Sequence, residues 1–314
     1  MPLSLLYKRR GFVLSEPAAR TGPRGRANAL GRGTARPGVE SPLRPLPDRP
    51  ILRVAPPRRP DRPFLVAADV HLGLGGTRER PGGPPGANAE SMAALLVAAA
   101  RATGADRVVL AGDVKHPIVG TPPALRRPIF DFCGALLGEG LAVDVVLGNH
   151  DVGLVRHLPA EVVVHPARGI VVDGVGIFHG HRWPSNAVLR APRLVVGHLH
   201  PGYRLAPTAD DPSGKRPVWL RATLPGPPAR RRRRTRRAPI AARELVVVPA
   251  LNPIAGTEAL NRARPARGRS FLWGRFLARG TCRAYLLDGT DLGELPTGAP
   301  TPSPAERPRS PRGR

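Results

Sequence analysis

The feature that most constrains this chain is a set of five apolar runs that each end abruptly in side chains able to bind metal. The clearest is VVLGNHDVG, in which aliphatic residues lead into Gly148 and then into three polar residues. In open α/β sheets, ligands gather at the carboxyl ends of the strands. We therefore expect the five endings to converge in space. They are Asp69 with His71, Asp113 after Gly112, Asn149–His150–Asp151 after Gly148, His179 with His181, and His198 with His200.

The spacing and chemistry of these residues point to divalent metal ions. Residues i and i+2 of a strand face the same side, so Asp69 with His71, and His198 with His200, each offer two ligands to one site. Carboxylate, imidazole and amide donors suit borderline divalent ions such as manganese, iron, zinc or cobalt, and of these we expect manganese. The donors are too many for one tetrahedral ion, whereas two metals about 3.5–4 Å apart, bridged by a carboxylate, would use them all. The two cysteines, Cys133 and Cys282, lie far apart, which is typical of a reducing compartment.

The apolar patterns predict a layered α/β domain whose sheets turn antiparallel late in the chain. Two helices are expected, at residues 87–104 and in the proline-containing stretch 123–138. Strands are expected within residues 63–71, 107–113, 142–151, 161–165, 169–181, 193–200, 215–226, 244–253 and 282–293.

The basic residues are concentrated outside this pattern. Residues 63–200 carry 12 Arg and Lys against 11 Asp and Glu, so the flanks hold nearly all of the net charge of +26. We predict a disordered Arg/Pro/Gly-rich arm at residues 1–62, a folded domain at 63–295 with an exposed Arg-rich insertion at 225–242, and a disordered basic tail at 296–314. A transit peptide or an incorrectly assigned start are alternatives for the arm. No apolar run approaches the roughly 18 residues of a membrane span, and we expect a cytoplasmic protein.

The ordered motifs DxH, GD, GNHD, H and GHxH over residues 69–200 resemble those of the calcineurin-like metallophosphoesterases. The resemblance implies a four-layer α/β/β/α sandwich with two metals at one edge of the sheets. It places His150 beside the scissile phosphate, with Asp151 orienting His150. His181 is an alternative ligand to His179. The implied first metal site is Asp69, His71, Asp113 and His200, and the second is Asp113 as bridge, Asn149, His179 and His198.

The resemblance also implies a reaction, in which a hydroxide between the two metals attacks phosphorus in line. We expect phosphodiester substrates, at nucleic-acid ends or in nucleotides. One alternative is a phosphomonoesterase for a small molecule or a protein. The other is a DNA- or RNA-binding scaffold that uses the basic flanks, including the run Arg230–Arg237, and has an idle metal site.

A subgroup resemblance is also present. GDVKH, GHLHP and residues 244–261 and 284–293 look like the ICC-like, DNA-ligase-associated phosphoesterases, which implies an association with DNA ligase or helicase. Leu199 departs from that subgroup, in which an acidic residue is expected between the two histidines.

Overall fold

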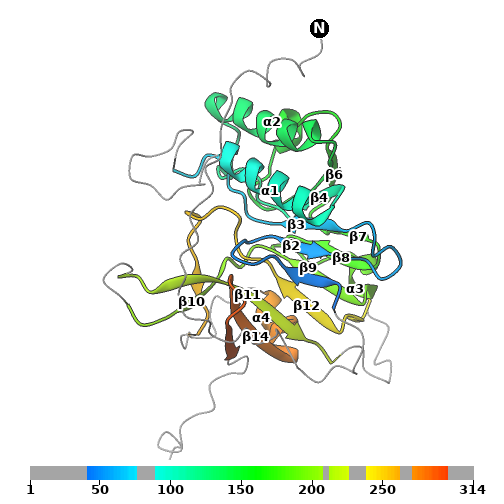
Figure 1. Ribbon diagram of the computed structural model, residues 1–314, viewed down its shortest axis with the longest axis vertical. Coiled ribbons are helices and arrows are strands. Elements are labelled where there is room, and N and C mark those ends of the chain that lie inside the picture. The colour runs from blue at the N-terminus through cyan, green and yellow to red at the C-terminus, as the bar shows by residue number, and fades with distance from the viewer. Residues whose placement is uncertain (1–40, 76–88, 208–211, 226–237, 262–270, 296–314) are drawn as a thin grey trace, which may run out of the picture. The chain divides into compact units, whose positions relative to one another are not determined.

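The computed structural model describes residues 41–75, 89–207, 212–225, 238–261 and 271–295. They form two β-sheets and several helices (Figure 1). No helix among these residues has both the length and the apolar character needed to cross a membrane.

The first sheet has the strand order β1-β2-β3-β4-β5-β6. The pairs from β3 to β6 are parallel, whereas β1 and β2 join antiparallel. Its strands are β1 (Leu43–Pro45), β2 (Leu52–Val54), β3 (Phe64–Ala67), β4 (Arg107–Leu110), β5 (Ala142–Val146) and β6 (Val163–His165).

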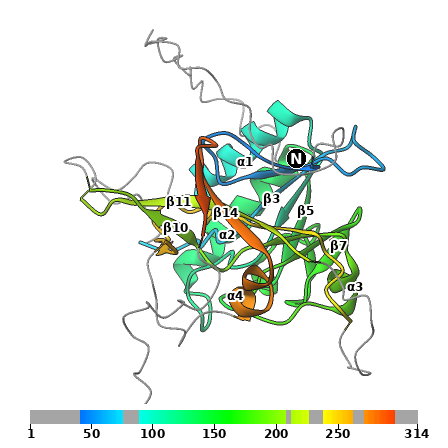
Figure 2. The ribbon, with the colours of Figure 1, turned by 90° about the horizontal axis from the view of Figure 1, so that it is seen from below.

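The second sheet has the order β13-β10-β11-β12-β9-β8-β7, with β14 pairing with β11 and β15 with β14. It mixes parallel pairs with the antiparallel pairs expected late in the chain. The β10–β11 hairpin extends beyond the neighbouring strands in both views (Figures 1 and 2). The strands are β7 (Ile170–Val172), β8 (Val175–Phe178), β9 (Arg193–Val196), β10 (Pro201–Arg204), β11 (Lys215–Thr223), β12 (Glu244–Val247), β13 (Glu258–Ala259), β14 (Thr281–Leu286) and β15 (Asp291–Glu294).

The helices follow the strands in sequence. The two expected helices are present as α1 and α2, and Gly104 ends α1 with a φ of 67°. Four short helical elements, which lack a full apolar period, were not expected. The helical elements are α1 (Ala89–Thr103), α2 (Pro123–Gly138), the 3-10 turn η3 (Leu154–His157), α3 (Asn186–Arg190), α4 (Phe271–Arg275) and the 3-10 turn η4 (Leu277–Arg279).

Three apolar clusters separate four layers. The first packs α1 and α2 on one face of the first sheet, through residues such as Leu96, Phe132 and Val145. The second lies between the sheets and joins Val146 of β5 to Trp219 of β11. The third packs α3 and α4 on the outer face of the second sheet. Because neighbouring residues of a strand point to opposite faces, each sheet contributes side chains to two of the apolar clusters. The expected four-layer α/β/β/α sandwich is confirmed.

The folded domain begins earlier than the sequence pattern indicated. β1 and β2 lie inside the stretch expected to be a disordered arm, and Leu43, Leu52 and Val54 are fully buried. Each strand has only three residues among prolines and arginines, so no alternating period is long enough to be recognised. Residues 1–40 of the expected arm, most of the Arg-rich insertion and the expected tail lie outside the described residues.

Candidate metal centre

The predicted ligands lie in loops that follow β3, β4, β5, β8 and β9, at the carboxyl ends of the strands. Five of them have a positive φ, which non-glycine residues rarely adopt. Only two other non-glycine residues of the described chain share this conformation, Asp48 and Asp173. Each such residue costs of order 1–3 kcal/mol, and these conformations cluster at functional sites. The predicted ligands with a positive φ are Asp69, His71, Asp113, His198 and His200.

Two glycines let the loops approach one another closely. A Cβ on Gly148 would lie 2.1 Å from Oδ1 of Asp113. A Cβ on Gly112 would lie 2.4 Å from the His179 ring, and Gly112 also has a φ of 93°. Glycine at these positions therefore brings the β4, β5 and β8 loops into contact.

The first group of converging side chains is Asp69, His71 and His200, which offer ligand atoms within 4.8 Å of one another. Nε2 of His200 lies 3.3 Å from Oδ1 of Asp69 and 3.2 Å from Nε2 of His71. The other carboxylate oxygen of Asp69 accepts a hydrogen bond from the backbone N–H of His198 (2.9 Å), which fixes the direction of Oδ1.

The second group is Asp113, His179 and His198, with the same 4.8 Å limit. Nε2 of His179 lies 3.2 Å from Oδ2 of Asp113 and 3.2 Å from Oδ1 of Asn149. Its Nδ1 is paired with the carbonyl of Ala111 (2.9 Å). The His181 ring stands beside this group, with its centroid 5.2 Å from that of His179.

Oδ2 of Asp113 faces both groups. It lies 3.2 Å from Nε2 of His179 in the second group and 3.9 Å from Nε2 of His71 in the first. The other oxygen, Oδ1, accepts the backbone N–H of His150 (2.8 Å) and is thereby held away from the shared space. Asp113 therefore occupies the position that a bridging carboxylate requires.

Burial and the neighbouring charges set the protonation of these groups. Burial would raise the pKa of Asp113, but His179 and His150 hold it well below its usual range. Burial would lower the pKa of His179, yet the Asp113 contact and the charge of Asp69 raise it to about 9. Burial lowers the pKa of His71 and of His198 to about 4. Both rings are thus neutral near pH 7, the form in which imidazole binds metal.

The side chains fit cations in two further respects. Oδ1 of Asp69 and Nδ1 of His71 are buried without a hydrogen-bond partner among the described residues. Buried polar atoms are normally hydrogen-bonded, so a carboxylate oxygen whose nearest neighbour is an imidazole nitrogen at 3.3 Å has the capacity to bind a cation. The donors are hard oxygen and borderline nitrogen without thiolate, which suits divalent first-row metals.

His150 is oriented by a different group from the one expected. Its Nε2 lies 3.8 Å from Oδ2 of Asp113, and its Nδ1 pairs with the backbone carbonyl of His116. The Asp151 carboxylate instead accepts the backbone N–H groups of Gly148, Val114 and Lys115, at 2.8, 2.9 and 3.2 Å. Asp151 therefore ties together the two loops that carry Asp113 and His150, and it does not hold the imidazole itself.

Two further residues, Asn252 and His116, lie at the centre, and sequence reasoning gave Asn252 no role. Asn252 is buried, and its Nδ2 donates to the carbonyls of Val70 and His71 at 3.0 and 3.3 Å, which supports the loop after β3. The His116 ring stacks on His150, with centroids 5.5 Å apart. The signal for Asn252 was a polar residue at the end of the apolar stretch 245–251, which begins in β12 and resembles the five ligand endings.

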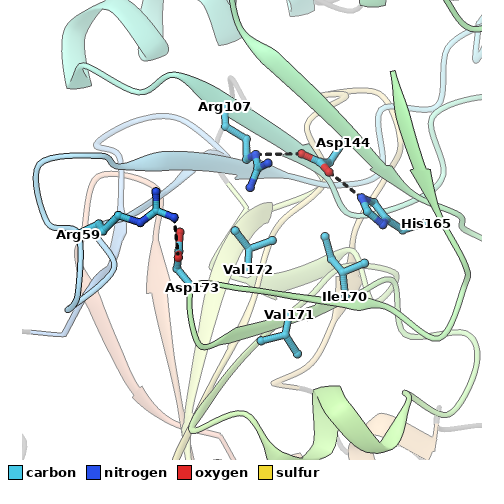
Figure 3. A pocket seen from close by; sticks show the side chains of 8 residues that line it. All are labelled: Arg59, Arg107, Asp144, His165, Ile170, Val171, Val172 and Asp173. Carbon is cyan, nitrogen blue, oxygen red and sulfur yellow. Dashed lines mark hydrogen bonds and ion pairs between the residues drawn. The ribbon is translucent and has the colours of Figure 1, made fainter. Parts of the chain in front are cut away.

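A second charged cluster, which includes none of the predicted ligands, lines a pocket formed in part by β4, β5, β6 and β7 (Figure 3). Asp144 of β5 is buried, with Arg107 at 3.1 Å on one side and His165 at 2.6 Å on the other. Arg59 pairs with Asp173 at 3.6 Å on another side of the same cavity of about 410 Å³, which the aliphatic residues of β7 also line. Each carboxylate here has a cationic partner, so the cluster is accounted for as a structural network.

Comparison with known proteins gives a structural likeness only. No protein-family model matches the chain, and no curated protein does. Among solved structures, a Pseudomonas putida nuclease MPE matches with a TM-score of 0.47 and 18% identity, over 80% of this chain and 100% of that one. Yfce, a phosphoesterase from E. coli, matches with a TM-score of 0.33 and 13% identity, over 75% of this chain and 99% of that one. Because both TM-scores lie below 0.5, the chemistry of this chain has to be inferred from its own side chains.

Proposed function

We propose that this protein is a metal-dependent phosphoesterase of the calcineurin-like type that cleaves phosphodiesters. The observation that carries the proposal is the position of Asp113. Its Oδ2 stands between a group of Asp69, His71 and His200 and a group that includes His179. This is the arrangement that two cations sharing one carboxylate would need.

The expected ligand sets follow these two groups. Asp69, His71, Asp113 and His200 would hold one ion, and Asp113, Asn149, His179 and His198 the other. Two such cations, with manganese as the first choice, would neutralise phosphoryl oxygens and lower the pKa of a water molecule. His179 is preferred over His181 because its Nε2 lies 3.2 Å from both Oδ2 of Asp113 and Oδ1 of Asn149.

The chain's own residues supply the remaining chemistry. The carbonyl of His116 accepts Nδ1–H of His150, so Nε2 of His150 points into the space beside Asp113. From there it can carry a proton to the leaving oxygen or stabilise charge that develops on the phosphate. Asp151 keeps this geometry by fixing the loop that carries His150 to the loop that carries Asp113.

The test is hydrolysis of bis-p-nitrophenyl phosphate by manganese-loaded protein. Asp113→Asn should abolish the hydrolysis and reduce the bound metal. The matched control is Asp131→Asn, at an exposed carboxylate paired with Arg127 on α2. Activity that persists in Asp113→Asn would refute the proposal.

Comparing kcat/KM for the diester with that for p-nitrophenyl phosphate tests the preference for diesters. A higher value for the monoester would favour the phosphomonoesterase alternative.

The likeness to the ICC-like, DNA-ligase-associated group, with its association with ligase or helicase, stays a prediction.

A further inference from the structure

The cavity that the second charged cluster lines has the size of a small-molecule site. Its volume of about 410 Å³ lies within the roughly 300–1,000 Å³ that is typical of such sites. Its lining includes β6, the edge strand of the first sheet, and β7, the edge strand of the second, together with residues of β4 and β5. None of the predicted metal ligands lines it. The cavity is therefore a candidate for a second site, distinct from the metal centre.

The arginines of this cavity have more donors than its ion pairs use. Arg107 contacts Asp144 only through Nε, at 3.1 Å, so its two terminal nitrogens have no partner among the described residues. The contact of Arg59 with Asp173, at 3.6 Å, is too long to be a hydrogen bond. Two terminal nitrogens of one guanidinium match the two oxygens of a carboxylate. The unused donors of Arg107 therefore suit a carboxylate.

The cavity also has an unused acceptor. Asp144 engages both of its carboxylate oxygens, one with Arg107 and the other with Nε2 of His165 at 2.6 Å. Asp173 contacts Arg59 through Oδ1 alone, and its Oδ2 has no polar partner in the part of the chain that the structure describes. An ammonium group, which carries three donors, would find an acceptor there.

The charges of the lining cancel. With a neutral His165, the lining has two arginines and two aspartates as its charged side chains. An ion of one sign would meet as much repulsion as attraction in this cavity, whereas a zwitterion places each of its charges beside an opposite one. The cavity therefore favours a ligand that carries both a carboxylate and an ammonium group.

Aliphatic side chains form a third side of the cavity. Ile170 and Val172 share one face of β7, because they lie two residues apart in the strand. Figure 3 shows Arg107, Asp173 and this aliphatic pair on three different sides. The three substituents of an α-carbon also diverge in three directions. A branched aliphatic substituent would be removed from water on β7, which is favourable.

We propose that this cavity binds a free aliphatic α-amino acid, with leucine as the model ligand. The carboxylate would pair with Arg107, the ammonium group would pair with Asp173, and the side chain would pack on Ile170 and Val172. The cavity is separate from the metal centre, so this proposal does not rest on the proposed function.

The experiment is a calorimetric titration of the full-length chain with L-leucine and with two analogues that each lack one charge. The analogues are 4-methylpentanoate, without the ammonium group, and 3-methylbutylamine, without the carboxylate. Each should bind at least roughly tenfold more weakly than leucine, because a charge-assisted hydrogen bond is lost. Glycine, which lacks the aliphatic side chain, should also bind more weakly. Absence of leucine binding, or equal affinity for leucine and either analogue, would overturn the proposal.

Two variants test the two charged partners. Asp173→Asn keeps a residue type that tolerates the φ of 46° at this turn, and it should weaken leucine roughly tenfold while leaving 4-methylpentanoate unchanged. Arg107→Lys keeps the positive charge beside Asp144 but lacks the planar fork, so it should weaken both ligands. The matched controls are Asp61→Asn and Arg58→Gln, at exposed residues outside the lining, and both should bind leucine like the wild type. A thermal melt of each variant establishes that it is folded, and a folded Asp173→Asn with wild-type leucine affinity would refute the site.

Leucine can also ligate a metal ion through its amino and carboxylate groups, so the titration is repeated after dialysis against EDTA. The same affinity with and without manganese would place leucine outside the metal centre. Binding that requires manganese would overturn the proposal. None of these readouts uses hydrolysis, so failure of this site and failure of the proposed function are separate results.

Discussion

Replacing Gly148 by alanine tests the close packing on which the shared position of Asp113 depends. The new Cβ would lie 2.1 Å from Oδ1 and 2.3 Å from the backbone nitrogen of Asp113, whereas an ordinary contact is at least 3.4 Å. The two loops must therefore separate by about 1.3 Å. Misplacement of about 1 Å at a catalytic group costs roughly a hundredfold in rate. Overpacking of a buried contact costs about 1–3 kcal/mol of stability.

We expect Gly148→Ala to lower kcat/KM for bis-p-nitrophenyl phosphate about a hundredfold and to lose bound manganese, while the chain remains folded in a thermal melt. Metal content after dialysis, kinetics and melting temperature are measured on the same preparation. The matched control is Gly134→Ala in α2, where a Cβ meets no heavy atom within 4 Å. That change should stabilise the protein by about 0.5–1 kcal/mol and leave activity intact. If Gly148→Ala keeps wild-type metal content and kcat/KM, the close approach does not position Asp113.

Three further predictions concern single features of the structure. Asn252→Ala removes the side-chain donor to the Val70 carbonyl and leaves the His71 carbonyl with the backbone N–H of Leu74 alone. It should cost about 1–3 kcal/mol of stability and lower manganese affinity, which a denaturant titration and calorimetry would measure; equal stability would contradict the support role. The pKa of His179 is raised to about 9, so below that pH a metal must displace the proton of this ring. The association constant of manganese, measured by calorimetry, should therefore fall about tenfold for each pH unit from pH 8 down to pH 6. An association constant that does not change with pH would refute this. Cys133 and Cys282 are buried and their pKa values are raised to about 12, so a thiol reagent should modify neither in the native protein and both after unfolding.

Much of the fold could be predicted because its strands are short, apolar and bounded by turn residues. The predicted helices at residues 87–104 and 123–138 match α1 and α2, and the predicted strands match elements of both sheets. The elements that were missed, such as β1, β2 and α3, have three to five residues. At that length neither an alternating nor a helical period is distinguishable from irregular sequence. Their positions are decided by packing against other elements.

The sequence by itself determined which side chains are available to the centre and in which strand endings they lie. Metal chemistry needs carboxylate and imidazole donors, and the carboxyl ends of strands converge whatever their separation along the chain. The convergence of Asp69 with His200 and of Asp113 with His179 and His198 follows from those two rules.

Only the tertiary structure decided how the donors are arranged. It directs Oδ2 of Asp113 toward both groups, gives the orienting contact of His150 to the carbonyl of His116, and uses Asp151 to join two loops. It also brings Asn252 to the loop after β3, across 182 residues of sequence. Contacts of this kind depend on left-handed loop conformations and on backbone atoms that every residue shares, so no side-chain pattern in the sequence encodes them.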